Sequence, residues 1–197
     1  MSVQNEGEIK VIVQLIRMYY KDKEFAVVTP YDAQRGRIET ALKAEGLRWE
    51  DSVFNIDSFQ GIFMLFLPAP VRLKTFLGNE RRFVLASLVR TQRPGFLSSH
   101  NRLNVLLTRC KEGMVVVANR RFLESSGIRI LVAQFASHWK SRYGSGVWVS
   151  PGDVVKGCVD LPGSSAPNPS GRVLVEYGSG AWGMGTTAAG GASYAPR

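Results

Sequence analysis

The stretch FAVVTPYDAQRGRIETALKAEG, Phe25–Gly46, decides the fold predicted for this chain. Its first five residues, FAVVT, form a short apolar and β-branched run, which is typical of a buried strand. Apolar residues then recur at helical spacing over Ala33–Ala44, and Gly46 is a residue type that commonly ends a helix. A buried strand followed directly by a helix is the repeating unit of a parallel α/β sheet.

The same alternation extends to both sides of this stretch. Two further segments show helical spacing, Ile9–Lys21 and Arg102–Lys111, and the second is predicted to end at Gly113. Short runs rich in apolar residues predict the remaining strands, Val53–Asp57, Phe83–Val89 and Met114–Ala118. The sequence therefore predicts an α/β fold in which helices flank a parallel sheet. Ligands of such sheets bind at the carboxyl ends of the strands.

Composition indicates one ordinary domain with a basic surface. The chain has 197 residues, of which 45% are hydrophobic, so it can bury a sizeable core. Its formal charge is +9, and residues 1–140 carry +8 of that charge. A basic surface suits a polyanionic partner such as nucleic acid or nucleotide, although basic proteins without such partners are common.

The cysteine and histidine content excludes a disulfide-rich protein and a zinc-binding protein. The only cysteines are Cys110 and Cys158, and there are two histidines, so the sequence contains neither a disulfide framework nor zinc-like ligand spacing. We therefore expect a reducing, intracellular location, in the cytoplasm or the nucleus. The N-terminus does not resemble a signal peptide, and the longest apolar run, Ile62–Val71, is too short to span a bilayer, so no membrane anchor is expected.

Composition changes after Trp139. Residues 141–197 hold 12 of the 20 glycines and 5 of the 9 prolines, with few apolar positions in periodic order. We therefore expect a folded domain over residues 1–140 and a Gly/Pro/Ser-rich disordered tail over residues 141–197.

Two arginines are candidates for phosphate contacts. Arg35 falls in the first turns of the helix that follows the strand ending at Thr29, where free backbone N–H groups and a guanidinium suit phosphate oxygens. Arg102 and Arg109 are seven residues apart and are expected on one side of their helix, away from its leucines. Exposed helices that carry solvated arginines would show the same patterns, and spacing alone leaves both interpretations open.

DSFQG, Asp57–Gly61, combines a carboxylate, a hydroxyl, an amide and a glycine after a predicted strand. These groups can bind sugar or phosphate, but Asp and Ser also build ordinary turns. No phosphate loop of the form G-x-x-x-x-G-K-[ST] occurs in the sequence, and no Ser-His-Asp set is credible with two histidines. The residues alone give little support to independent catalysis.

Taken in order, these segments resemble one family, the superfamily 1 helicases of the nonsense-mediated-decay and senataxin type, and specifically their second RecA-like domain. The matching segments are S-x-x-N-x-x-E at Ser2–Glu8, TPYDAQR at Thr29–Arg35, VFNIDSFQG at Val53–Gly61, NE at Asn79–Glu80, and RLNVLLTR at Arg102–Arg109. Each motif is weak by itself, but their order over residues 1–140 is specific. The resemblance implies a RecA-like P-loop NTPase-type sheet.

The resemblance also implies roles for individual residues. Arg109 would act as an arginine finger on the γ-phosphate of ATP, and Arg35 is similar in position to a second phosphate-contacting arginine. Glu80 would accept a hydrogen bond from the ribose, and Gln60 and Gly61 resemble the segment that couples nucleotide to nucleic acid. The family's partner is single-stranded RNA or DNA. Thr29 and Ser58 match family positions that lie near the phosphates of the bound strand.

The sequence departs from the family pattern in the passage IFMLFLPAPVRLKTFLG, Ile62–Gly78. It separates Gly61 from Asn79, which the family places almost side by side. We interpret the passage as an aberrant insertion, hypothetically translated intron, because deleting it restores DSFQGNERRF. The alternative is a genuine loop insertion at a permissive site, but its exposed apolar residues would need a cover that the sequence does not supply.

A second departure is that these residues do not include the family's first RecA-like domain, which carries the phosphate loop and the acidic motif that holds Mg²⁺. Helicase ATP sites lie between the two domains, so we expect no ATP turnover from these residues alone. One alternative is a non-catalytic nucleic-acid-binding or helicase-interacting module on the same scaffold. Another is a product that never folds, which a cooperative melt would exclude.

Overall fold

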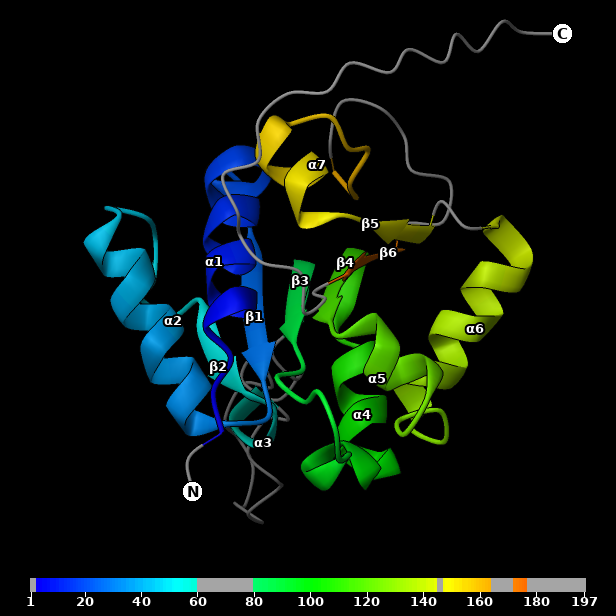
Figure 1. The fold of residues 1–197 in the computed structure, drawn as a ribbon. Helices are drawn as coiled ribbons and strands as arrows, with labels where there is room; N and C mark the ends of the chain where they lie inside the picture. The colour runs from blue at the N-terminus through cyan, green and yellow to red at the C-terminus, as the bar shows by residue number, and fades with distance from the viewer. Residues whose placement is uncertain (1–2, 60–79, 145–146, 164–171, 177–197) are drawn as a thin grey trace, which may run out of the picture.

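A computed structural model describes residues 3–59, 80–144 and 147–163, and the backbone of residues 172–176 (Figure 1). These residues form a six-stranded sheet in the order β2-β1-β3-β4-β6-β5, and every pairing in it is parallel. Its strands are β1 Phe25–Thr29, β2 Val53–Asn55, β3 Arg81–Ser87, β4 Cys110–Ala118, β5 Trp148–Val149 and β6 Arg172–Glu176. The predicted α/β class with a parallel sheet flanked by helices is confirmed, and the fold is consistent with a RecA-like domain.

Helices cover both faces of this sheet (Figure 1). They are α1 Glu6–Leu15 with its π-helical continuation η1 Ile16–Tyr20, α2 Asp32–Ala44, α3 Ile56–Phe59, the 3₁₀ turn η2 Gly95–Ser98, α4 His100–Leu107, α5 Arg120–Glu124, α6 Leu131–Tyr143 and α7 Pro151–Lys156. Side chains of a strand alternate between its two faces. Phe25 and Val27 therefore pack with α1, α2 and α7, whereas Ala26 and Val28 pack with α3, α4, α5 and α6.

β1 and α2, the unit that decided the prediction, form as the sequence indicates. All five residues of β1 are buried, and α2 buries Ile38 and Leu42 on the face toward the sheet. Gly46 follows α2 with φ +63°, a left-handed conformation that favours glycine. The buried strand and the half-buried helix together place the turn at Thr29–Tyr31 at the carboxyl edge of the sheet.

Two predicted elements end earlier than expected. The strand predicted over Val53–Asp57 stops at Asn55, because the Asn55 side chain accepts the Asp57 N–H at 3.1 Å and begins the short helix α3. The helix predicted over Arg102–Lys111 stops at Leu107, and the chain enters β4 at Cys110. Pairing of β4 with β3 overrides the local helical pattern there, and Gly113 lies within the strand.

The ordered structure extends beyond the expected boundary at residue 140. Val147, Val154 and Leu161 are buried, and Ser150 caps α7 by accepting the Asp153 N–H. This differs from the expectation of a disordered tail from residue 141, because these scattered apolar residues pack on the same sheet. The passage Ile62–Gly78 and the remainder of the tail, residues 164–171 and 177–197, lie outside the described residues. Within the described part, no helix is long and apolar enough to cross a membrane.

Candidate functional site

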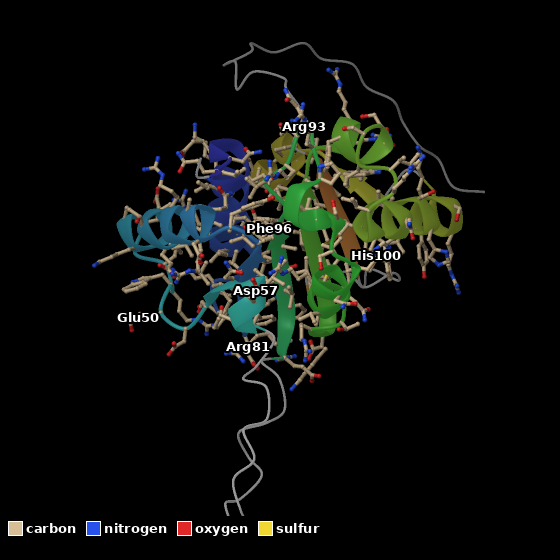
Figure 2. All side chains as sticks on the ribbon, turned by 90° about the horizontal axis from the view of Figure 1, so that it is seen from below. Glu50, Asp57, Arg81, Arg93, Phe96 and His100 are labelled. Carbon is tan, nitrogen blue, oxygen red and sulfur yellow. The ribbon has the colours of Figure 1, made fainter. Side chains whose placement is uncertain are left out.

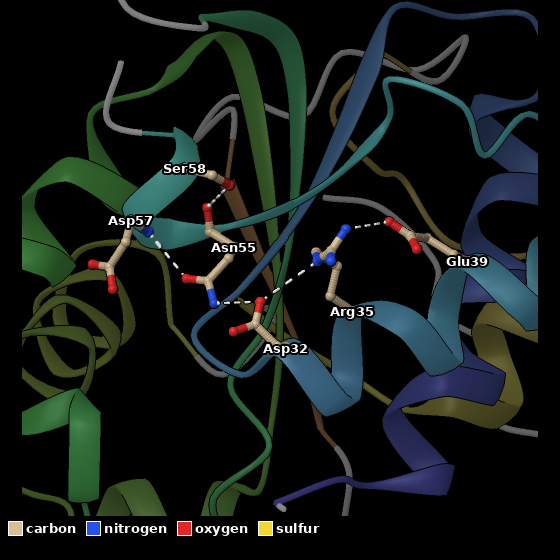
Figure 3. A network of polar contacts seen from close by, with 6 residues as sticks. All are labelled: Asp32, Arg35, Glu39, Asn55, Asp57 and Ser58. Atoms are coloured by element: carbon tan, nitrogen blue, oxygen red, sulfur yellow. Dashed lines mark hydrogen bonds and ion pairs between the residues drawn. The ribbon is translucent and has the colours of Figure 1, made fainter. Parts of the chain in front are cut away.

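The carboxyl ends of β1 and β2 meet at one edge of the sheet, where Thr29 pairs with Asn55 (Figure 3). The Asn55 side chain donates to the Asp32 carboxylate at 3.0 Å, which joins β2 to the start of α2. Arg35 forms ion pairs with Asp32 at 3.6 Å and with Glu39 at 2.8 Å. Both carboxylates belong to its own helix, so the Arg35 geometry fits the interpretation of an arginine on a solvated helix.

The first residues of DSFQG also form local contacts at this edge (Figure 3). The Ser58 hydroxyl donates to the Asn55 carbonyl at 2.9 Å, as in an ordinary turn. The Asp57 carboxylate instead pairs with Arg102 of α4 at 2.8 Å. Gln60 and Gly61, for which we predicted a coupling role, lie outside the described residues.

Thr29 ends β1 with its side chain in the interior. It is fully buried, and its Oγ1 has no hydrogen-bond partner among the described residues. In this conformation the hydroxyl is not accessible to the phosphates of a bound strand. A phosphate contact by the Thr29 side chain would require the corner between β1 and α2 to open.

Arg109 lies at the opposite edge of the sheet from Arg35. It follows α4, and its carbonyl accepts the Arg81 N–H at 3.2 Å where β3 begins. Because the strands are parallel, the start of β3 and the end of β1 lie at opposite edges. The expected common face of Arg102 and Arg109 is therefore wrong, since only Arg102 is in the helix.

The structure does bring Arg109 close to the predicted ribose-binding residue. Glu80 is exposed and immediately precedes Arg81, whose backbone bonds to that of Arg109. The Nε atom of Arg109 is buried and has no hydrogen-bond partner within the described ranges. Buried guanidinium nitrogens normally have partners, so this unpaired donor points to a missing acceptor.

A buried polar network that sequence analysis did not identify as a site connects α1, α2 and the end of β3. The Glu8 carboxylate accepts the Val89 N–H at 2.9 and 3.1 Å and the Ser87 hydroxyl at 2.6 Å. The Gln34 amide donates to Ser87 Oγ at 3.0 Å, and its oxygen accepts the Asn5 N–H at 2.8 Å. This network holds Val89 at φ +70°, an unusual conformation for a β-branched residue.

Burial raises the pKa of Glu8 to about 7, even though the hydrogen bonds from Ser87 and the Val89 backbone act in the opposite direction. A signal for this network is present in the sequence. Glu8 lies on the same helical face as Ile12 and Leu15, and Gln34 precedes Ile38 by one turn, so each is a polar residue within an apolar stripe. The three-residue spacing of Asn5 and Glu8 contributed to the family resemblance, but it did not indicate burial.

A second group that the sequence did not reveal lies in the loop between β3 and α4. Arg90 contacts Tyr31, and Arg102 contacts Phe96, around a cavity of about 550 Å³. In the view from below, Phe96 lies between Arg93 and Asp57 (Figure 2). Among the described residues, no three His, Cys, Asp or Glu side chains are grouped so that they could hold a metal ion.

Comparisons with known proteins agree with the family resemblance. A family model described as an AAA domain matches residues 71–121, so the match begins within the passage Ile62–Gly78. The chain is 32% identical over 117 residues to the Regulator of nonsense transcripts 1 homolog of Neurospora crassa, covering 58% of this chain and 10% of that protein. It is 30% identical over 141 residues to the ATP-dependent helicase upf1 of Schizosaccharomyces pombe, covering 68% of this chain and 13% of that protein.

A third relative is the putative ATP-dependent RNA helicase ECM32 of Saccharomyces cerevisiae, 32% identical over 150 residues, with 62% of this chain and 13% of that protein covered. These matches and the α/β fold relate the chain to the superfamily 1 helicases. Within that class, it is similar to the UPF1-like helicases, the group that includes the regulators of nonsense transcripts. The matched region spans only 10–13% of the length of these three relatives.

Proposed function

We propose that this chain forms the second RecA-like domain of an intracellular, ATP-dependent superfamily 1 helicase that acts on single-stranded RNA or DNA. The observation that carries the proposal is the order of the helicase motifs on a parallel sheet, from Thr29–Arg35 through Val53–Phe59 to Arg102–Arg109. Relatives named as ATP-dependent helicases support it. In this proposal, ATP binds at the junction with a first RecA-like domain, outside these residues.

The proposal places the nucleotide at the amino-terminal ends of β3 and β4, which differs from the carboxyl edge expected for ligands of a parallel sheet. A guanidinium presents planar N–H donors that match phosphate oxygens, and Arg109 has a buried donor without a partner among the described residues. The exposed Glu80 carboxylate nearby suits a ribose hydroxyl. ATP, when bound with Mg²⁺ on the first domain, supplies the phosphoryl group that is transferred. Arg109 would stabilise the negative charge on that group.

Of the remaining described candidates, this proposal assigns only Ser58 to the nucleic acid. Arg35 is at the opposite edge from Arg109 and is paired with two carboxylates, so we assign the γ-phosphate contact to Arg109 alone. Ser58 is exposed at the carboxyl edge, where a passing strand could be contacted without sequence selectivity. Gln60 and Gly61 keep in this proposal the coupling role that the family resemblance implies.

The proposal is tested by restoring the partner domain. Residues 3–176, which include β6, would replace the corresponding domain of the Schizosaccharomyces pombe ATP-dependent helicase upf1, with and without Ile62–Gly78. We expect at least one chimera to release phosphate from ATP in an RNA-stimulated manner, whereas the 197-residue chain alone shows no steady turnover because it contains no phosphate loop.

The outcomes separate the proposed function from its alternative. A folded chimera that binds RNA in a salt-dependent way but does not hydrolyse ATP would favour a non-catalytic nucleic-acid-binding module. ATP turnover by the isolated chain that disappears in an Arg109→Ala variant would contradict our assignment of the phosphate loop to another domain. The basic charge, +9 overall, favours nucleic-acid binding in either case.

Removal of Ile62–Gly78 is expected to preserve the fold. The deletion joins Gly61 to Asn79 and removes an apolar passage, so we expect cooperative thermal unfolding at an unchanged or higher temperature and less aggregation. The matched control replaces the passage with a Gly/Ser linker of equal length, which separates the effect of length from that of apolarity. A melting temperature lower by more than about 3 °C, roughly 1 kcal/mol for a chain of this size, would argue for a structural role of the passage.

A further inference from the structure

The loop between β3 and α4 carries the exposed ring of Phe96, which lies among aromatic and basic side chains that contact one another. Phe96 is 48% exposed, although its neighbour Leu97 is buried. The Phe96 and Tyr31 rings meet edge to face with centroids 5.7 Å apart. The guanidinium of Arg102 lies 4.8 Å from the Phe96 centroid, and that of Arg90 lies 5.0 Å from the Tyr31 centroid.

These side chains line a shallow groove that is largely open to solvent. Its cavity of about 550 Å³ is lined by Arg90, Gly95, Phe96, Ser98, Ser99 and Arg102. A second cavity of about 250 Å³ adjoins it through Arg90 and includes Arg93 in its lining. The groove therefore offers an aromatic surface, hydroxyl groups and arginines along a continuous path. This combination is typical of surfaces that bind single-stranded nucleic acid.

The backbone around the groove is held in place from both sides. Gly95 has φ +52°, a left-handed conformation that favours glycine. A Cβ at this position would meet only the far end of the Arg90 side chain, so the backbone conformation rather than the available space favours glycine. On the other side, the Glu8 carboxylate accepts the Val89 N–H and fixes the residue before Arg90. Arg90 also donates from Nε to the Tyr31 hydroxyl. Ordered side chains lose less conformational entropy when a ligand binds.

The charge of the groove favours a polyanion. Arg90, Arg93 and Arg102 contribute three cations, and Asp57 is the acidic partner of Arg102. An exposed phenylalanine ring would gain little from phosphate alone, but a base can stack on it. An acidic peptide would satisfy the arginines without using the ring in this way. A base in a duplex is already stacked, so the ring favours an unpaired base.

We propose that this groove binds one nucleotide of a single strand, with its base stacked on Phe96 and the adjoining phosphates near Arg90 and Arg102. The inference rests on the proposed function, because it takes single-stranded nucleic acid as the partner. It adds a base-stacking site to the predicted phosphate contacts at Ser58. Every base can stack on an aromatic ring, so the site would bind all four bases without selecting one.

The test measures binding of two labelled probes to the full chain by fluorescence anisotropy. One probe is an oligouridylate of about 12 nucleotides, and the other is an abasic RNA of equal length. We expect the wild type to bind the oligouridylate more tightly. Phe96→Ala should weaken that binding roughly tenfold and leave the abasic RNA unaffected, whereas Phe96→Tyr keeps the ring and the affinity. Arg102→Gln should weaken both probes and lower the salt dependence by about one phosphate contact.

Tyr143→Ala is the matched control, because Tyr143 is also exposed, at 42%, and has an arginine, Arg142, 5.8 Å from its ring. Wild-type binding that Phe96→Ala leaves unchanged, or changes equally for both probes, would overturn the stacking site and leave the proposed function intact. Equal competition by oligoglutamate would overturn the assignment to nucleic acid. Absence of wild-type binding to either probe would overturn the nucleotide site, and the chimera would still test the proposed function.

Discussion

Replacement of Arg109 by alanine should lower RNA-stimulated ATP hydrolysis of the two-domain chimera about 10³-fold or more. The loss follows from the arginine's role, because a guanidinium placed against the transferred phosphoryl group stabilises charge that develops only in the transition state. Arg109→Lys should recover little, since an ammonium lacks the planar fork of donors. The measurement is the steady-state rate of phosphate release at saturating RNA and ATP.

Two controls distinguish this role from a structural one. Arg37→Ala alters an exposed arginine that pairs with Glu6, and Arg35→Ala tests the expectation that only Arg109 reaches the nucleotide. We expect both rates to stay within about threefold of the unsubstituted chimera, because surface ion pairs contribute at most about 1 kcal/mol.

Thermal melting of the Arg109→Ala variant should be unchanged or higher, because the substitution removes a buried Nε that has no partner in the described part of the chain. A rate loss of less than about tenfold, or a comparable loss from Arg35→Ala, would contradict the assignment of Arg109 as the arginine finger.

The Glu8 carboxylate should make the free energy of unfolding depend on pH. The folded protein keeps the Glu8 proton up to a pKa of about 7, whereas the unfolded chain releases it near 4.5. The stabilisation from the protonated acid is therefore fully present below pH 4.5 and is lost as the pH rises through about 7. A shift of this size corresponds to roughly 3 kcal/mol.

Comparison with Glu8→Gln isolates this contribution, because glutamine resembles the protonated acid and does not titrate. We expect the stability of the wild type relative to Glu8→Gln to decrease between about pH 5 and about pH 8 in urea unfolding followed by tryptophan fluorescence. Glu6→Gln, an exposed change on the same helix, should leave the wild-type pH profile unchanged. A stability difference between wild type and Glu8→Gln that is constant over this range would rule out a raised pKa.

The predicted residue ranges were most accurate for elements that a single local pattern determines. β1 matches its predicted range, and α2 begins one residue before its own, because a run of buried residues and a helical period each require only nearby residues. The prediction for Arg102–Lys111 was wrong at its end. The helical spacing of apolar residues continues to Cys110. However, Cys110 pairs with β3 as the first residue of β4, so the helix ends at Leu107 and Arg109 lies outside it.

The sequence by itself determined the alternation of strands and helices, the basic charge and the helicase resemblance, since each depends on residue types and their order. Only the tertiary structure decided which candidates share a site. It separated Arg35 from Arg109, buried Thr29, and brought Glu8 to Val89, 81 residues away in the chain. The order of parallel strands sets such contacts, and the local periodicity of one segment contains no information about the segment that packs beside it.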